Sequence, residues 1–198
     1  MMLGFDFDNT LIRYDELFQK VVLESKLVPG SLPADKNAIR NYLYRLNMED
    51  EWTRIQGEVY GARINEARPF DGMLETLRSL KKARIKMCLV SHKTRTPYLG
   101  PSYDLHQAAF DWLTRQGFFD DQGLCWGEGH VFFESTKEAK VRKIVSLGCT
   151  HYIDDLPEIL KMLPDRITKI LFSPKDKIKE QNDWLVLRSW KDLPSLLL

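Results

Sequence analysis

The chain has 198 residues, of which 43% are hydrophobic and 29% are charged, and its formal net charge at pH 7 is +1. This length and composition are typical of a globular protein with one good core, and the balanced charge gives no reason to expect a nucleic acid or an anionic membrane as partner. No apolar stretch approaches the roughly 18 residues that a membrane-spanning helix needs.

The three cysteines indicate a reducing compartment. Cys88, Cys125 and Cys149 are far apart in the sequence and form no Cys-x-x-Cys pair, which is typical of free thiols rather than of a disulfide framework or a zinc site. A strand with acidic residues occupies the start of the chain, so we expect no leader segment there. We therefore expect a cytoplasmic protein.

The first predicted strand, residues 3–8, ends in two acidic residues. Residues two apart share a face of a strand, so Asp6 and Asp8 are expected together at its carboxyl end. Two carboxylates about 5 Å apart repel each other by roughly 1 to 3 kcal/mol. We therefore expect a cation, a proton or a substrate to offset this repulsion in the folded protein. Because Phe5 and Phe7 favour burial of this segment, we interpret the pair as functional rather than as a solvated turn.

A helical insertion is predicted directly after this strand. Three stretches of it favour helix: residues 15–26, 37–47 and 51–66. We expect these stretches to form a small helical cap at residues 14–67. The remaining residues, 1–13 and 68–198, are expected to form the core domain.

Beyond the insertion, apolar runs alternate with amphipathic segments. Helices are predicted at residues 72–83, 104–116, 136–147 and 159–163. Strands are predicted at residues 85–90, 131–133, 152–153, 167–172 and 184–187. This alternation indicates right-handed crossovers, and hence an α/β fold with a Rossmann-like parallel sheet that helices cover on both faces.

A hydroxyl and a lysine follow in the order that a phosphate site needs. Ser91 closes the apolar run 87–90, although a serine there is also a common cap. Residues 135–138 fit a capping box with Ser135 as the cap, which places Lys137 in the first helical turn, where the helix dipole favours an anion nearby. Lys140 and Lys143, further along this helix, are predicted to be solvated. Lys93 and Arg95, in the loop after Ser91, are candidates for guiding an anion to the site, although cations in loops are usually solvated.

A second acidic pair, Asp154 and Asp155, ends the apolar run 152–153, where either residue could instead cap the next helix. Carboxylates without nearby His or Cys select Mg²⁺ over Zn²⁺. Together with a hydroxyl and an ammonium group for phosphate oxygens, they are typical of phosphoryl transfer.

Taken in order, these motifs resemble those of the haloacid dehalogenase-like hydrolase superfamily, in its phosphatase branch with a small helical cap. The matching residues are Asp6, Asp8 and Thr10 for the first motif, Ser91 for the second, Lys137 for the third, and Asp154 with Asp155 for the fourth.

The resemblance implies a role for each of these residues. Asp6 would be the nucleophile that forms an aspartyl-phosphate, and Asp8 the general acid and then the general base. Thr10 would hold the turn after the first strand together. The backbone amide of His92 would join Ser91 and Lys137 in binding phosphate. The ligands of Mg²⁺ would be Asp6, the backbone carbonyl of Asp8 and the fourth motif, with Asp155 favoured as the direct ligand and Asp154 acting through water.

We therefore expect a magnesium-dependent phosphatase that acts on a small phosphorylated metabolite, with no nucleic acid or membrane partner. A phosphomutase would use the same site, and a non-catalytic domain that binds a phosphorylated ligand is a further alternative. A phospho-accepting receiver domain combines similar groups, but its paired acids follow its first strand, whereas this chain has its pair late. The substrate and the oligomeric state stay open.

Overall fold

The computed structural model describes residues 1–175 and 184–197. The chain divides into two compact units. The sheet unit comprises Met1–Ile12, Pro69–Lys93 and Gln116–Leu198, and the helical unit comprises Arg13–Arg68 and Thr94–Arg115. A search of the described residues finds no helix that is long and apolar enough to cross a membrane.

The sheet unit contains a parallel sheet with the strand order β5-β4-β1-β6-β7-β8. Its strands are β1 (Met2–Phe5), β4 (Lys86–His92), β5 (Val131–Glu134), β6 (His151–Asp154), β7 (Thr168–Phe172) and β8 (Leu185–Leu187). The first strand of the chain therefore lies in the middle of the sheet, between β4 and β6.

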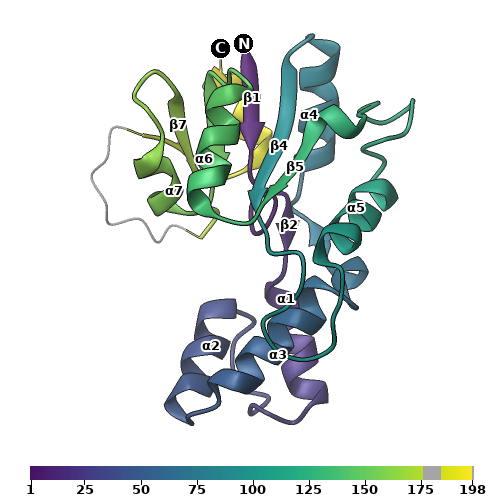
Figure 1. Cartoon of the computed structure of the whole chain (residues 1–198), viewed down its shortest axis with the longest axis vertical. Coiled ribbons are helices and arrows are strands. Elements are labelled where there is room, and N and C mark those ends of the chain that lie inside the picture. The colour runs from purple at the N-terminus through teal and green to yellow at the C-terminus, as the bar shows by residue number, and fades with distance from the viewer. Residues whose placement is uncertain (176–183, 198) are drawn as a thin grey trace. The chain divides into compact units, whose positions relative to one another are not determined.

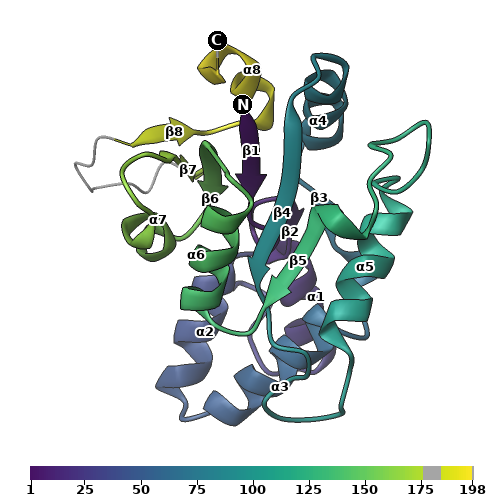
Figure 2. The same ribbon diagram turned by 45° about the horizontal axis from the view of Figure 1, so that its top comes forward.

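Helices cover both faces of this sheet, as Figures 1 and 2 show, with α6 and α7 on one face and α4 and α8 on the other. The helices and 3-10 turns of this unit are α4 (Met73–Lys82), η2 (Glu128–His130), α6 (Lys137–Ser146), α7 (Pro157–Met162), η3 (Trp190–Asp192) and α8 (Leu193–Leu197). The predicted parallel α/β fold is confirmed. Apart from β1, the strands of this sheet and the helices α4 and α6 agree with their predicted ranges to within two residues.

The local sequence explains why β1 is central. Leu3 and Phe5 are fully buried, and Gly4 on the opposite face is buried too, as expected for a strand that is covered on both faces. Gly4 pairs in register with Cys88 on β4 and with Tyr152 on β6. The strand ends at Phe5, three residues earlier than predicted, so the acidic residues follow the strand instead of lying within it.

The helical unit is built from α1 (Asp15–Glu24), α2 (Lys36–Arg45), α3 (Glu49–Tyr60), η1 (Ile64–Glu66) and α5 (Leu105–Arg115). Aromatic rings form much of its core: Phe18 stacks on Trp52 at 5.0 Å between ring centroids, and Tyr14 packs edge-on against Tyr60 at 4.8 Å. The predicted helix at residues 51–66 is interrupted at Gly61, where α3 ends.

One segment of the helical unit lies outside the insertion predicted from the sequence. Residues 94–115, which include α5, belong to this unit. The indole Nε1 of Trp112 donates a hydrogen bond to the carbonyl oxygen of Ala67 at 2.9 Å, and both residues are buried. The short strands β2 (Ile12–Arg13) and β3 (Arg68–Pro69) pair where the chain passes between the units.

Candidate active site

Asp6 lies directly after β1, in the middle of the sheet. Its backbone N–H donates to the carbonyl oxygen of Ile153 at 2.9 Å, which extends the pairing of β1 with β6. Only 4% of Asp6 is exposed. The carboxyl ends of parallel strands are where α/β sheets place their ligands, and the order of strands puts the ends of β4 and β6 on either side of Asp6.

Two donors converge on one oxygen of Asp6. Ser91 Oγ on β4 donates to Oδ1 at 2.8 Å, and Lys140 Nζ on α6 donates to the same atom at 2.6 Å. Both donors are 1% exposed. Oδ2 of Asp6 accepts no hydrogen bond from the part of the chain that the structure describes, so one oxygen is held and the other stays open to an incoming group.

Lys140 also links Asp6 to the end of β6. Its Nζ donates to Oδ2 of Asp154 at 2.7 Å, and Oδ1 of Asp154 accepts the backbone N–H of Leu156 at 2.9 Å. Complete burial of Asp154 raises its pKa, while Lys140 opposes that rise. Burial alone would lower the pKa of Lys140, but Asp154 and Asp6 outweigh it and raise this pKa. The raised pKa of Lys140 shows that the carboxylates around it favour a positive charge, whereas the raised pKa of Asp154 comes mainly from its burial.

Three carboxylates form a group that could hold a metal ion. One oxygen each of Asp6, Asp154 and Asp155 lies within 4.8 Å of the others. Ligands on opposite sides of Mg²⁺ are separated by about 4.2 Å, twice its ligand distance, and Mg²⁺ prefers carboxylate oxygens. The residues present therefore fit a hard divalent cation, although the geometry does not discriminate between Asp154 and Asp155 as the direct ligand.

Asp8 lies in the turn that follows the first strand, not on the strand as predicted. The backbone N–H groups of Thr10, Leu11 and Ile12 all donate to the carbonyl oxygen of Phe7 at 3.0–3.3 Å. Both carboxylate oxygens of Asp8 accept hydrogen bonds from Lys93 Nζ, at 3.0 and 2.9 Å. Lys93 is only 4% exposed, so it is not solvated as cations in loops usually are.

The lysine of the third motif needs correction. Lys137 is the first residue of α6 and forms an exposed ion pair with Glu158 at 2.8 Å, whereas the lysine that reaches Asp6 is Lys140, which was predicted to be solvated. The helix is capped by Thr136, not Ser135. The apolar residue four positions after Lys140, Ile144, is buried on the same helix face. The same spacing relates Lys137 to the apolar Val141, so the sequence pattern alone does not distinguish the two lysines.

Thr10 and His92 have contacts that the sequence did not foresee. Thr10 contributes to the turn through its backbone N–H, while its buried Oγ1 has no hydrogen-bond partner among the described residues. His92 Nε2 lies 3.1 Å from the carbonyl oxygen of Ser135, which can only accept, so the ring N–H donates. The use of the His92 backbone amide for phosphate stays a prediction.

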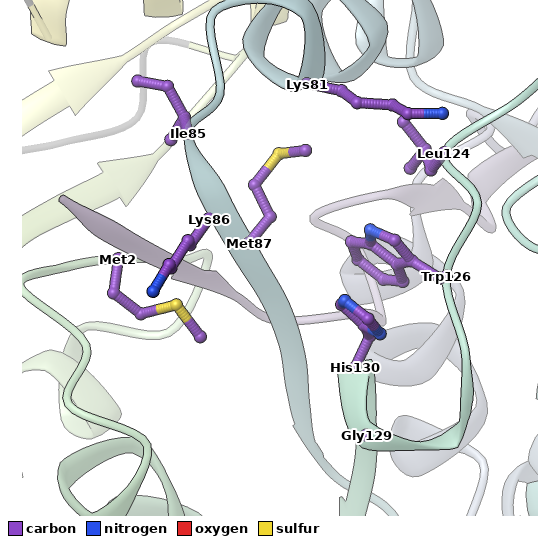
Figure 3. A pocket seen from close by; sticks show the side chains of 9 residues that line it. All are labelled: Met2, Lys81, Ile85, Lys86, Met87, Leu124, Trp126, Gly129 and His130. Carbon is purple, nitrogen blue, oxygen red and sulfur yellow. The ribbon is translucent and has the colours of Figure 1, made fainter.

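A cavity of about 360 Å³ lies elsewhere in the sheet unit. It is found near the amino ends of β1 and β4, and its lining includes Met2, Lys86 and Met87. Figure 3 shows the rings of Trp126 and His130 side by side on its other wall. None of the residues that line it belongs to the carboxylate cluster, so this cavity is separate from the candidate active site.

Comparison with known sequences gives one distant relative and no family model. A candidate nucleotidase from Oceanobacillus iheyensis is 23% identical over 200 residues, which cover 97% of this chain and 96% of that protein. No family model matches the chain.

Solved structures show the fold more clearly. A candidate haloacid dehalogenase-type hydrolase from Bacillus subtilis, solved with bound magnesium, has a TM-score of 0.61 at 14% identity and covers 99% of this chain and 97% of its own. A hydrolase of the same type from Deinococcus radiodurans, solved with phosphate and sodium, has a TM-score of 0.60 at 16% identity, with 99% and 94% covered. A phosphoserine phosphohydrolase-like protein from Francisella tularensis has a TM-score of 0.58 at 15% identity, with 99% of both chains covered.

Proposed function

We propose that this chain, which has the fold of the haloacid dehalogenase-like hydrolases, is a magnesium-dependent phosphatase that hydrolyses a small phosphomonoester. The observation that carries the proposal is the convergence on Asp6. A buried carboxylate after the central strand is held by Ser91 and Lys140 through one oxygen, and two further carboxylates lie beside it. A solvated turn would not require a buried lysine.

In the proposed reaction, an oxygen of Asp6 attacks the phosphorus atom and the bond from phosphorus to the leaving alcohol breaks. Asp8 gives a proton to the leaving oxygen. A water molecule then attacks the phosphorus of the aspartyl-phosphate, Asp8 accepts a proton from that water, and the bond between phosphorus and Asp6 breaks. Ser91 and Lys140 orient Asp6 and favour the negative charge that develops on the transferring group.

Asp6, Asp154 and Asp155 are the proposed side-chain ligands of Mg²⁺, with the backbone carbonyl of Asp8 as a further ligand. When bound, the ion would neutralise these carboxylates and favour negative charge on the phosphate oxygens. This assignment is supported by the geometry, since one oxygen each of Asp6, Asp154 and Asp155 lies within 4.8 Å of the others, and the ammonium group of Lys140 contacts only Asp6 and Asp154 among them. It is also supported by the magnesium bound to the Bacillus subtilis protein of the same fold.

The proposed substrate class is a small phosphorylated metabolite. Because the Oceanobacillus iheyensis relative is named as a candidate nucleotidase, nucleoside monophosphates are the first compounds to test, followed by sugar phosphates. The helical unit is, in this proposal, the part of the chain that selects the substrate. The cytoplasmic location stays a prediction.

The first experiment measures phosphate release from p-nitrophenyl phosphate with Mg²⁺. We expect Asp6→Asn to abolish the activity, because the amide is not a nucleophile, while circular dichroism stays that of the unchanged protein. Asp165→Asn is the matched control, since Asp165 is exposed and forms only a long ion pair with Lys169, at 3.5 Å. We expect this control to retain full activity.

Two outcomes would contradict the proposal: activity that survives Asp6→Asn, and activity that persists in excess chelator. Steady release of inorganic phosphate from a natural substrate favours hydrolysis. A product that retains its phosphate at a new position would instead indicate a phosphomutase.

A further inference from the structure

A second buried lysine follows strand β4. The backbone N–H of Lys93 donates to the carbonyl oxygen of Glu134, at the end of β5, at 2.9 Å. Its Nζ donates to both oxygens of Asp8 and lies 5.4 Å from the centroid of the Phe7 ring. Lys93 is therefore held at its backbone by β5 and at its ammonium group by the turn that carries Asp8.

This pair differs from an ordinary surface ion pair. The side chain of Lys93 is 3% exposed and that of Asp8 is 22% exposed. Burying an ammonium group carries a desolvation penalty that an exposed pair avoids. The other buried lysine, Lys140, donates to Asp6 and Asp154 and has no contact with Asp8. Each aspartate of the first motif thus has its own buried lysine.

The two-point contact determines how the Asp8 carboxylate is oriented. The terminal torsion of aspartate is broad when the side chain is free, but a single ammonium group on both oxygens restricts its rotation. To act as a general acid, Asp8 must carry a proton on one oxygen, and its other oxygen can then still accept from Lys93 and keep the carboxyl group oriented. The proton-bearing oxygen must lie within about 2.6 to 3.2 Å of the atom that it protonates.

We propose that Lys93 is a positioning residue that orients the Asp8 carboxylate for proton transfer to the leaving group. This inference rests on the proposed phosphatase function and on the role of Asp8 in it. Lys93 acts through Asp8 rather than on the substrate, so its contribution depends on how much the leaving group needs a proton.

Two aryl phosphates of similar shape separate this role from a general structural one. Phenolate is a poor leaving group, because phenol has a pKa near that of tyrosine, about 10, whereas the nitro group makes p-nitrophenol much more acidic. We expect Lys93→Met to lower kcat/KM for phenyl phosphate by about 100-fold, within the range of general acid catalysis. For p-nitrophenyl phosphate we expect a loss of only about 3-fold, since that leaving group departs without protonation.

The quantity to compare is kcat/KM with Mg²⁺, because it reports the steps up to departure of the leaving group and excludes hydrolysis of the intermediate. Lys93→Arg retains a cation with several donors and is expected to restore most of the activity on phenyl phosphate. When Asp8→Asn is already present, adding Lys93→Met should not change the ratio of the two kcat/KM values any further. Lys86→Met, at the exposed other end of β4, is the matched control and should leave both values unchanged.

Equal losses on the two substrates would overturn the positioning role while leaving the phosphatase proposal intact. A further change of the ratio in the Asp8→Asn background would overturn it as well. If Lys93→Met does not fold, Lys93→Gln, which removes the charge but keeps an amide donor, takes its place, and its loss is again expected to be larger for phenyl phosphate than for p-nitrophenyl phosphate. Absence of activity in the unchanged protein on both substrates would instead overturn the phosphatase proposal, and this inference with it.

Discussion

Lys137 and Lys140 lie three residues apart on α6, yet Lys137 is in an exposed ion pair and Lys140 is buried in contact with two carboxylates. A helix turns by about 100° per residue, so the side chains of two residues three positions apart point in directions that differ by about 60° around the helix axis. That difference decides which lysine reaches Asp6. The sequence predicts that a lysine near the start of this helix contributes to the site. Which lysine points toward Asp6 depends on how α6 packs against the sheet.

We expect Lys140→Met to lower kcat/KM by at least about 100-fold, the usual effect of removing one group that stabilises the transferring charge. Removing one partner of a buried pair also costs about 3 to 5 kcal/mol of unfolding free energy. Lys137→Met should change kcat/KM by less than about 3-fold, because an exposed ion pair contributes little. Steady-state kinetics and urea unfolding of both variants test this, and a larger loss for Lys137→Met would restore the assignment made from the sequence.

At the scale of elements, the centre of the sheet requires a residue without a side chain. A Cβ atom on Gly4 of β1 would lie 2.7 Å from Cδ2 of Tyr152 and 2.9 Å from Sγ of Cys149. Tyr152 cannot move aside easily, because it is fully buried and its hydroxyl donates to the carbonyl oxygen of Val90. The close approach of β1 and β6 therefore depends on Gly4.

We expect Gly4→Ala to lower the free energy of unfolding by about 1 to 3 kcal/mol, the typical cost of overpacking a core. Gly129→Ala is the matched control in the same unit, since a Cβ atom there would meet nothing within 4 Å. Urea denaturation measures both variants. If Gly4→Ala proves as stable as Gly129→Ala, the conclusion that the packing of β1 against β6 excludes a Cβ atom at residue 4 is wrong.

At the scale of the whole molecule, the proposed metal ligands come from distant parts of the sequence. Asp6 follows β1, and Asp154 and Asp155 lie at the end of β6, almost 150 positions later. An ion that binds all three can bind the folded chain but not the unfolded one. Metal binding and folding are therefore expected to be linked.

We expect Mg²⁺ to raise the melting temperature, by an amount that grows with its concentration and corresponds to about 2.7 kcal/mol at 100 times its Kd. Asp155→Asn removes one ligand of the cluster and should reduce this dependence, whereas Asp165→Asn should leave it unchanged. Thermal unfolding followed by circular dichroism at several Mg²⁺ concentrations provides the measurement. A melting temperature that does not respond to Mg²⁺ would contradict the assignment of the cluster as a metal site.

The sequence alone was sufficient for the α/β class, the order of strands and helices, and the acidic and hydroxyl residues at the strand ends. These features are local, because apolar periodicity determines the elements, and the carboxyl ends of parallel strands necessarily meet at one edge of a sheet. Ser91 accordingly donates directly to Asp6, and Asp154 is linked to Asp6 through Lys140, which donates to both carboxylates.

The tertiary structure decided what depends on contacts between remote segments. It selected Lys140 instead of Lys137, paired Lys93 with Asp8, and placed residues 94–115 in the helical unit. The spacing of residues in the sequence cannot predict which lysines are buried. Burial of a lysine becomes favourable only when carboxylates from other parts of the chain lie around it.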